Sequence, residues 1–162
     1  MKRLILMRHA KATEGLYGKS DFDRVLDPKG IRDAELIGQE LNLVVKHIDL
    51  LVFSSAQRTK MTADLIRKQI KINENKGDAE LYDASPIFMK SFIDSIDDRY
   101  ETVMIIGHNP TQTFLLEYYS GNRIGNLPTS GFGVLDFDIE SWKEVSYNSA
   151  TLSHYIFPKG LS

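Results

Sequence analysis

Short apolar runs alternate along the chain with longer amphipathic segments. Apolar and alternating patterns predict strands at residues 2–7, 50–53, 79–82, 102–106 and 132–138. A further strand is expected around residues 144–157, at the antiparallel edge of the sheet. Strands that alternate with helical segments are typical of an α/β domain with a mostly parallel sheet.

Four helices are predicted between these strands. Three of them begin with a capping residue followed by proline, in the pairs Asp27-Pro28, Ser85-Pro86 and Asn109-Pro110. The first helix is expected near 28–46, because apolar residues keep helical spacing there. Ser54-Ser55 is expected to cap a second helix that runs to about residue 70. The fourth helix should end near Gly121.

The order of these elements predicts a three-layer α/β/α sandwich. The central sheet should be mostly parallel, with an antiparallel edge strand, and residues 1–162 should form a single domain. A polar loop containing Gly15 and Gly18 follows the first strand. The chain has no internal repeat and no inter-domain linker.

Composition removes several classes of function. The formal net charge is -2 and the sequence pI is about 6.1, so no basic excess indicates nucleic-acid binding. The chain contains no cysteine, which excludes disulfides, thiolate catalysis and zinc sites built on thiolates. The apolar run from Leu4 to Met7 is too short for an export signal or a membrane span, so a cytoplasmic protein is expected.

Arginine and histidine side chains that could bind or attack a ligand follow the ends of three predicted strands. The first strand ends in Arg8-His9, and the second leads to Arg58 in the first turn of a helix. The strand at 102–106 is followed by Gly107-His108. Ligands of open α/β sheets bind at the carboxyl ends of the strands, where helix N-termini add positive potential. These side chains therefore predict a phosphate site. The other two histidines, His47 and His154, do not lie at the carboxyl end of a predicted strand, so they are expected to be structural.

Four motifs together carry a resemblance to a known family. They are Met7-Arg8-His9-Ala10, Asp23-Arg24-Val25-Leu26 with Gly30, Ser54-Ser55-Ala56-Gln57-Arg58-Thr59, and Gly107-His108-Asn109-Pro110. In order and spacing, from the first strand to Asp138, they resemble the phosphoglycerate-mutase-like histidine phosphatase superfamily. Within it the chain looks most like the small SixA-type phosphohistidine phosphatases. It departs from the family pattern at Ala10, where glycine is usual, and at Val25, where proline is usual.

The resemblance implies a role for each matching residue. His9 would attack phosphorus, and Arg8, Arg58 and His108 would hold the phosphoryl oxygens. Glu80 would donate the proton to the leaving group. The Glu80 motif is short, so Asp83 stays open as the alternative donor. The family needs no metal or other cofactor, and in this chain the two arginines with a protonated His108 would supply the positive field that Mg²⁺ provides elsewhere.

Larger members of the family carry an insertion that caps the active site. In this chain only about ten residues separate the expected helix end near residue 70 from the strand at 79–82, which leaves little room for such a cap. An open site suits a phosphorylated protein, so we expect a monomeric hydrolase of phosphohistidine or another phosphoprotein. A hydrolase of a small phosphoester or phosphoanhydride is the alternative. A metal hydrolase using His9, His108 and Asp21 or Asp23 is a further hypothesis, although two arginines would oppose a divalent cation. A phosphate-binding module without catalysis is the remaining hypothesis.

Overall fold

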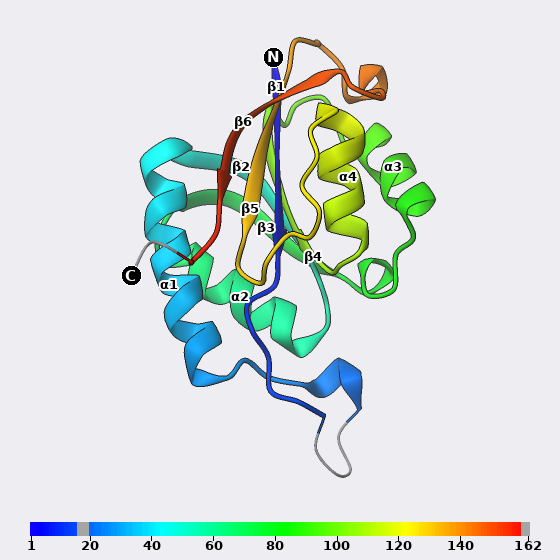
Figure 1. Cartoon of the computed structure of the whole chain (residues 1–162). Helices are drawn as coiled ribbons and strands as arrows, with labels where there is room; N and C mark the ends of the chain where they lie inside the picture. The colour runs from blue at the N-terminus through cyan, green and yellow to red at the C-terminus, as the bar shows by residue number, and fades with distance from the viewer. Residues whose placement is uncertain (16–19, 160–162) are drawn as a thin grey trace.

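A six-stranded sheet lies between two layers of helices in the computed structural model, which describes residues 1–15 and 20–159 (Figure 1). Gly18 of the polar loop falls outside the described residues. The strands are β1 (Lys2–Arg8), β2 (His47–Ser54), β3 (Lys71–Asp78), β4 (Thr102–Gly107), β5 (Phe132–Phe137) and β6 (Ala150–Ile156). Their order across the sheet is β3-β2-β4-β1-β5-β6.

Strand direction confirms the mostly parallel sheet. Strands β1 to β4 pair in parallel, β5 is antiparallel to β1, and β6 is antiparallel to β5 at the edge. The reversed strand is therefore β5, one position inside the edge. The carboxyl ends of β1, β2 and β4 consequently meet at one end of the sheet, the lower end in Figure 1.

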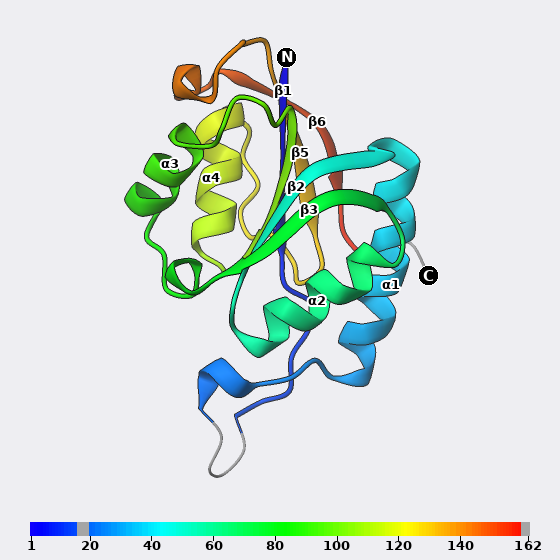
Figure 2. The same ribbon diagram turned by 180° about the vertical axis from the view of Figure 1, so that it is seen from behind.

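Helices cover both faces of the sheet, which confirms the three layers. Helices α1 (Pro28–Val44) and α2 (Gln57–Arg67) lie on one face, and α3 (Pro86–Asp94) and α4 (Thr111–Ser120) lie on the other (Figure 2). None of the helices in the described part of the chain is long and apolar enough to cross a membrane.

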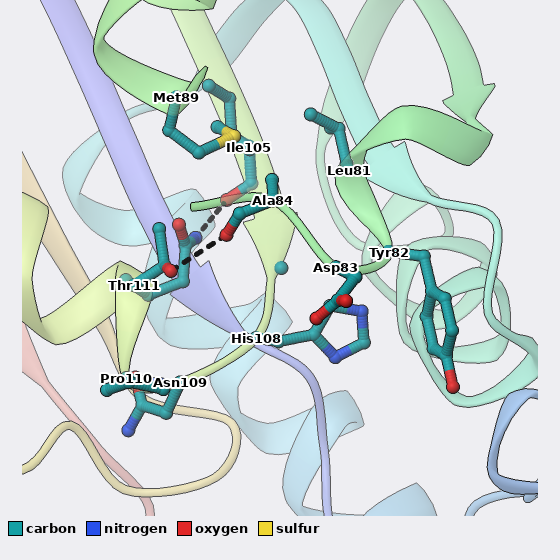
Figure 3. Close-up of a pocket in the computed structure, with 12 residues that line it drawn as sticks. Leu81, Tyr82, Asp83, Ala84, Met89, Ile105, His108, Asn109, Pro110 and Thr111 are labelled. Carbon is teal, nitrogen blue, oxygen red and sulfur yellow. Dashed lines mark hydrogen bonds between the residues drawn. The ribbon is translucent and has the colours of Figure 1, made fainter. Parts of the chain in front are cut away.

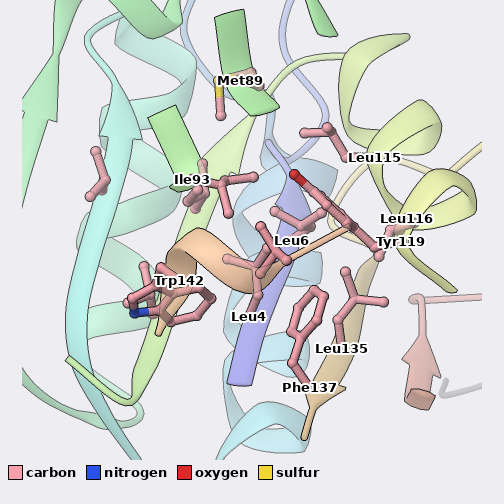
Figure 4. Packing of buried hydrophobic residues seen from close by; sticks show 14 of the residues in the cluster. Leu4, Leu6, Met89, Ile93, Leu115, Leu116, Tyr119, Leu135, Phe137 and Trp142 are labelled. Carbon is pink, nitrogen blue, oxygen red and sulfur yellow. The ribbon is translucent and has the colours of Figure 1, made fainter. Parts of the chain in front are cut away.

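Alternating side chains of β1 enter two separate cores. Leu4 and Leu6 pack with side chains of α3 and α4 on one face (Figure 4). Ile5 and Met7 pack with side chains of α1 and α2 on the other face. All four β1 side chains are fully buried. Burying one such side chain stabilises a fold by about 1.5–3 kcal/mol, so β1 is anchored from both sides and holds its carboxyl end in place.

Most of the predicted helix boundaries are confirmed. The Asp27 side chain accepts a hydrogen bond from the Gly30 N–H at 2.7 Å, and the Ser85 side chain accepts one from Phe88 at 3.1 Å. Gly121 ends α4 in the left-handed conformation, with φ of 72°. That conformation favours glycine because a Cβ atom is strained there.

The start of α2 differs from the prediction. The capping residue is Ala56, whose side chain cannot accept a hydrogen bond, and the helix ends at Arg67. Ser54 is the last residue of β2, and its hydroxyl accepts from the Ala56 N–H at 3.3 Å. Ser54 therefore braces the turn before the helix and does not cap it.

The predicted strand at 79–82 is wrong. The strand in this region is β3, which ends at Asp78, and Ala79–Leu81 form a 3-10 helix (η2). The Asp78 side chain accepts from the Glu80 N–H at 2.9 Å and so starts this turn. Because β3 is an edge strand with mostly exposed polar residues, it lacks the apolar pattern by which buried strands are recognised.

Candidate active site

The strand ends bring His9 and His108 together. Arg8 and Gly107 are partners in the register of β1 and β4, and the His9 N–H donates to the Gly107 carbonyl at 3.1 Å. The two imidazole rings that follow these strands have centroids 5.2 Å apart. Arg58 reaches the same place from the first turn of α2. The structure thus gathers all four side chains that the sequence indicated at the strand ends.

One nitrogen of His9 is available for attack. The Nδ1 atom lies 2.8 Å from the Ala10 carbonyl oxygen. A carbonyl oxygen can only accept, so Nδ1 must carry the hydrogen and Nε2 must carry the lone pair. Arg58 Nε donates to that Nε2 atom at 3.3 Å. The backbone therefore selects the tautomer in which Nε2 is the nucleophilic atom.

His9 is uncharged under ordinary conditions. Its pKa is lowered to about 3, chiefly by burial and also by the nearby His108, Arg58 and Arg8, against the opposing hydrogen bond to Ala10. A neutral imidazole keeps its lone pair and does not repel a phosphate dianion. The environment thus favours the form that a phosphoryl transfer requires.

Arg58 is almost fully buried and lies between the two histidines. It is 6% exposed. Besides its bond to His9, its NH2 atom lies 3.4 Å from His108 Nδ1. Its outer edge is held by Asp21, whose carbonyl oxygen accepts from NH1 at 2.7 Å and whose carboxylate accepts from NH2 at 3.1 Å.

Arg8 carries an unused donor. Its NH1 atom donates to the Leu127 carbonyl at 3.0 Å, which fixes the guanidinium. Its buried Nε atom has no hydrogen-bond partner among residues 1–15 and 20–159. Buried donors are nearly always paired in folded proteins, because an unpaired one costs about 1–3 kcal/mol. A phosphoryl oxygen would reach this donor only after neighbouring atoms move, because the Nε atom is inaccessible to solvent.

His108 is neutral in the free protein, so the protonated His108 expected with bound phosphate stays a prediction about the occupied site. Burial, followed by the charge of Arg58, lowers its pKa to about 4. Its Nε2 atom lies 2.8 Å from the Ser54 hydroxyl. The positive charge of the site therefore comes from the two arginines, and His108 contributes a neutral ring. A bound dianion would raise the His108 pKa by favouring its charged form.

The two candidate proton donors occupy different surroundings. Glu80 is exposed on the η2 turn. Asp83 lines, with His108, a cavity of about 80 Å³ whose other walls come from α3, β4 and the start of α4 (Figure 3). The negative charge of Asp83 also raises the pKa of His108, against the larger effects of burial and Arg58. Glu80 is not among the residues that line this cavity.

Sequence reasoning missed two residues of the site. The sequence indicates Asp21 only as a possible metal ligand and gives no signal for Tyr82. The Tyr82 hydroxyl donates to the Asp21 carboxylate at 2.6 Å, and the Tyr82 ring meets His108 edge-on with centroids 5.7 Å apart. The nearby Asp23-Arg24 motif pointed to this loop, but no spacing rule shows that a 3-10 turn (η1, Asp21–Asp23) carries Asp21 to Arg58.

Arg24 braces the loop that carries Asp21. Its Nε atom donates to the Thr13 carbonyl at 2.7 Å, and its NH1 atom donates to the Asp21 carboxylate at 2.9 Å. The Asp23 carboxylate accepts from the Ser20 hydroxyl at 2.9 Å. None of these three interactions places Arg24 or Asp23 against the two histidines.

The metal-hydrolase hypothesis lacks a ligand set. Within residues 1–15 and 20–159, no three side chains of histidine, aspartate or glutamate are grouped as a metal ion would require. Asp21, one of the supposed ligands, instead pairs with the buried cation of Arg58. The donors of this site therefore suit an anion.

The buried histidines should make stability depend on pH. Their pKa values of about 3 for His9 and about 4 for His108 lie below the ordinary value of 6.5. As the pH falls below that ordinary value, the unfolded chain binds protons at these positions and the folded chain does not. The free energy of unfolding is therefore expected to decrease as the pH falls from about 6.5 towards the folded-state values.

Urea denaturation near pH 7 and near pH 5 measures this dependence. The double variant His9→Gln, His108→Gln should lose less stability between the two conditions than the unsubstituted protein. An equal loss in both proteins would show that these histidines do not titrate as their burial implies.

The sequence matches a family model and curated relatives. The family model described as Histidine phosphatase superfamily (branch 1) matches residues 4–85. An uncharacterized protein of Mycobacterium tuberculosis is 32% identical over 94% of this chain and 100% of its own length.

Solved structures are similar over nearly the whole chain. A crystal structure from Agrobacterium tumefaciens, assigned as the phosphohistidine phosphatase SixA, is 30% identical with a TM-score of 0.81, covering 97% of this chain and 98% of that one. The protein histidine phosphatase SixA complexed with tungstate has a TM-score of 0.83 at 18% identity, covering 99% of each chain, and shows the shared fold.

Proposed function

Because the chain belongs to the histidine phosphatase superfamily, we propose that it is a phosphatase that acts through a phosphohistidine formed on His9. The observation that carries the proposal is the Nε2 atom of His9. It bears a lone pair, is neutral, and faces the donors of Arg58. A nucleophile surrounded by fixed cationic donors is the arrangement that phosphoryl transfer requires.

The reaction would proceed in two steps. In the first, His9 Nε2 forms a bond to phosphorus while the bond from phosphorus to the leaving atom breaks. Arg8 and Arg58 balance the charge on the equatorial oxygens, and His108 contacts the same group. In the second step water attacks the phosphohistidine, which releases inorganic phosphate and restores the lone pair on His9.

A carboxyl group would give a proton to the leaving atom and then take one from the attacking water. Glu80 and Asp83 are both available for this role. The position of Asp83 on the cavity beside His108 favours Asp83. A phosphohistidine substrate would depend less on this proton, because imidazole is a better leaving group than an alkoxide.

We propose a phosphorylated protein, with phosphohistidine as its reacting group, as the substrate. The similarity to the SixA protein of Agrobacterium tumefaciens supports this class. Large apolar side chains on η1, α3 and α4 are also exposed to solvent. Phe22, which packs edge-on against Tyr82, is 37% exposed, and Ile87 and Phe114, near the starts of α3 and α4, are 77% and 40% exposed. Of the three, Phe22 is placed at the site by its contact with Tyr82, and an exposed aromatic side chain there would contact a protein substrate. A small phosphoester is the second candidate.

Turnover in the presence of EDTA tests the proposal. We expect release of phosphate from a histidine-phosphorylated protein and, more slowly, from p-nitrophenyl phosphate, with no loss on chelation. Because binding energy from remote parts of a substrate raises the rate at the reacting centre, the protein substrate should have the higher kcat/KM. A higher kcat/KM for small esters would favour the second candidate, and the absence of turnover on both would contradict the phosphatase.

A further inference from the structure

We propose that Asp21 is a positioning residue that holds Arg58 and Tyr82 against the two histidines, and that its charge also limits how tightly the site retains phosphate. The inference rests on the proposed function and adds a residue to it. Asp21 lies on η1, and the hydrogen bonds of its carbonyl and carboxylate go to Arg58, Arg24 and Tyr82, not to either histidine.

The positioning role follows from how Asp21 divides the donors of Arg58. The main-chain carbonyl and the carboxylate of Asp21 take one donor each from NH1 and NH2, at 2.7 and 3.1 Å. The Nε atom is left to face His9, and the NH2 group also faces His108. A guanidinium is planar, so holding its outer edge fixes the direction of its inner edge. Asp21 thereby aims the donors that a phosphoryl group would use.

The same carboxylate joins this loop to the opposite wall of the site. It accepts from the Tyr82 hydroxyl at 2.6 Å, and the Tyr82 ring packs edge-on against His108. Tyr82 directly precedes Asp83, the carboxylate on the cavity wall. Asp21 therefore links the residue that holds the phosphoryl oxygens with the segment that carries the candidate proton donor.

The charge of Asp21 has a separate consequence. Its hydrogen bonds to Tyr82 and Arg24, with the charge of Arg58, keep its pKa below the ordinary value, so it stays ionised. The Arg58 side chain is 7% exposed and the Asp21 side chain is 53% exposed, so solvent screens the carboxylate and leaves the guanidinium buried. An anion next to Arg58 weakens the attraction of that arginine for a phosphate dianion. Asp21 should therefore lower affinity for the product while keeping the donors aligned.

Asp23 provides a matched control. It lies on the same 3-10 turn and is exposed, but its carboxylate accepts from the Ser20 hydroxyl and does not pair with Arg58. Removing the Asp23 charge changes the net charge of the protein by the same amount. A difference between the variants at positions 21 and 23 therefore reports the contacts of Asp21 and not its charge alone.

The test compares Asp21→Asn, Asp21→Ala and Asp23→Asn for turnover of p-nitrophenyl phosphate and for binding of inorganic phosphate by calorimetry. Asp21→Ala should lower kcat about tenfold, because Arg58 loses the side-chain contact that aims it. Asp21→Asn should lower kcat less, since the amide oxygen can still accept. Both should bind phosphate about two- to fivefold more tightly, as expected for removal of one half-exposed charge. Asp23→Asn should match the unsubstituted protein.

A lower kcat together with a higher affinity for phosphate separates this positioning role from a merely structural one. Damage to the site would weaken phosphate binding and turnover together, and that result would overturn the inference. An unchanged kcat in Asp21→Ala would overturn it as well. Absence of turnover in the unsubstituted protein would contradict the proposed function, whereas the phosphate affinities of the variants at position 21 would still support or overturn the effect of its charge.

Discussion

His9→Ala is expected to reduce turnover on the order of 10⁴-fold or more, because the atom that attacks phosphorus is removed. The hydrogen bonds of His9 leave it with a lone pair directed at the cationic donor Arg58. Its Nδ1 hydrogen is bound by the Ala10 carbonyl, and its Nε2 lone pair faces Arg58. His108, the neighbouring ring, is held by the Ser54 hydroxyl and meets Arg58 through its other nitrogen, so it should not replace the nucleophile.

His47 and His154 offer controls for that variant. His47 is the first residue of β2 and His154 lies in β6, both away from the site. His47→Ala and His154→Ala should keep kcat within about twofold, as is usual for surface changes. Steady-state kinetics with p-nitrophenyl phosphate measures all three variants. Turnover by His9→Ala at the rate of the controls would require a different nucleophile.

Arg58→Ala is expected to lower kcat by about 10² to 10³, the usual effect of removing one preorganised donor to developing negative charge. The buried position of Arg58 makes its loss severe, because solvent does not screen the charge that it contributes. Arg58→Lys should recover only part of the rate. A lysine retains the charge but has no planar fork that faces His9 and His108 together.

Arg67→Ala is the matched control for Arg58. Arg67 lies on the same helix, and its side chain is 45% exposed beside Asp64. Its removal should leave kcat unchanged. Equal kinetics for the Arg58 and Arg67 variants would show that Arg58 does not stabilise the transition state. An unchanged melting temperature in Arg58→Ala would show that a loss of rate is not a loss of folding.

The sheet was predictable wherever strands are buried. The strands β1, β2 and β4 each contain a buried apolar run, which made both their positions and the convergence of their carboxyl ends predictable. Strand β3 was not predictable, because an edge strand need not be apolar and this one is mostly exposed. Because β3 lacks an apolar pattern, the strand of this region was wrongly predicted at 79–82.

The identities of the site residues were predictable from the sequence, but their protonation states and their contacts with one another were less so. The motifs indicated Arg8, His9, Arg58 and His108, because side chains at strand ends meet at one edge. The protonation of His108 depends on its burial and on the distance to Arg58, and neither is encoded in a motif. The contact of Asp21 with Arg58 spans 37 positions, so no local pattern could indicate it.

Mass spectrometry of the protein quenched during turnover in EDTA tests the central claim most directly. With a histidine-phosphorylated protein or p-nitrophenyl phosphate, we expect an acid-labile phosphate on His9 that is absent from His9→Ala. Phosphate on another residue, or turnover without any adduct under conditions that trap a phosphohistidine standard, would contradict a reaction that passes through His9.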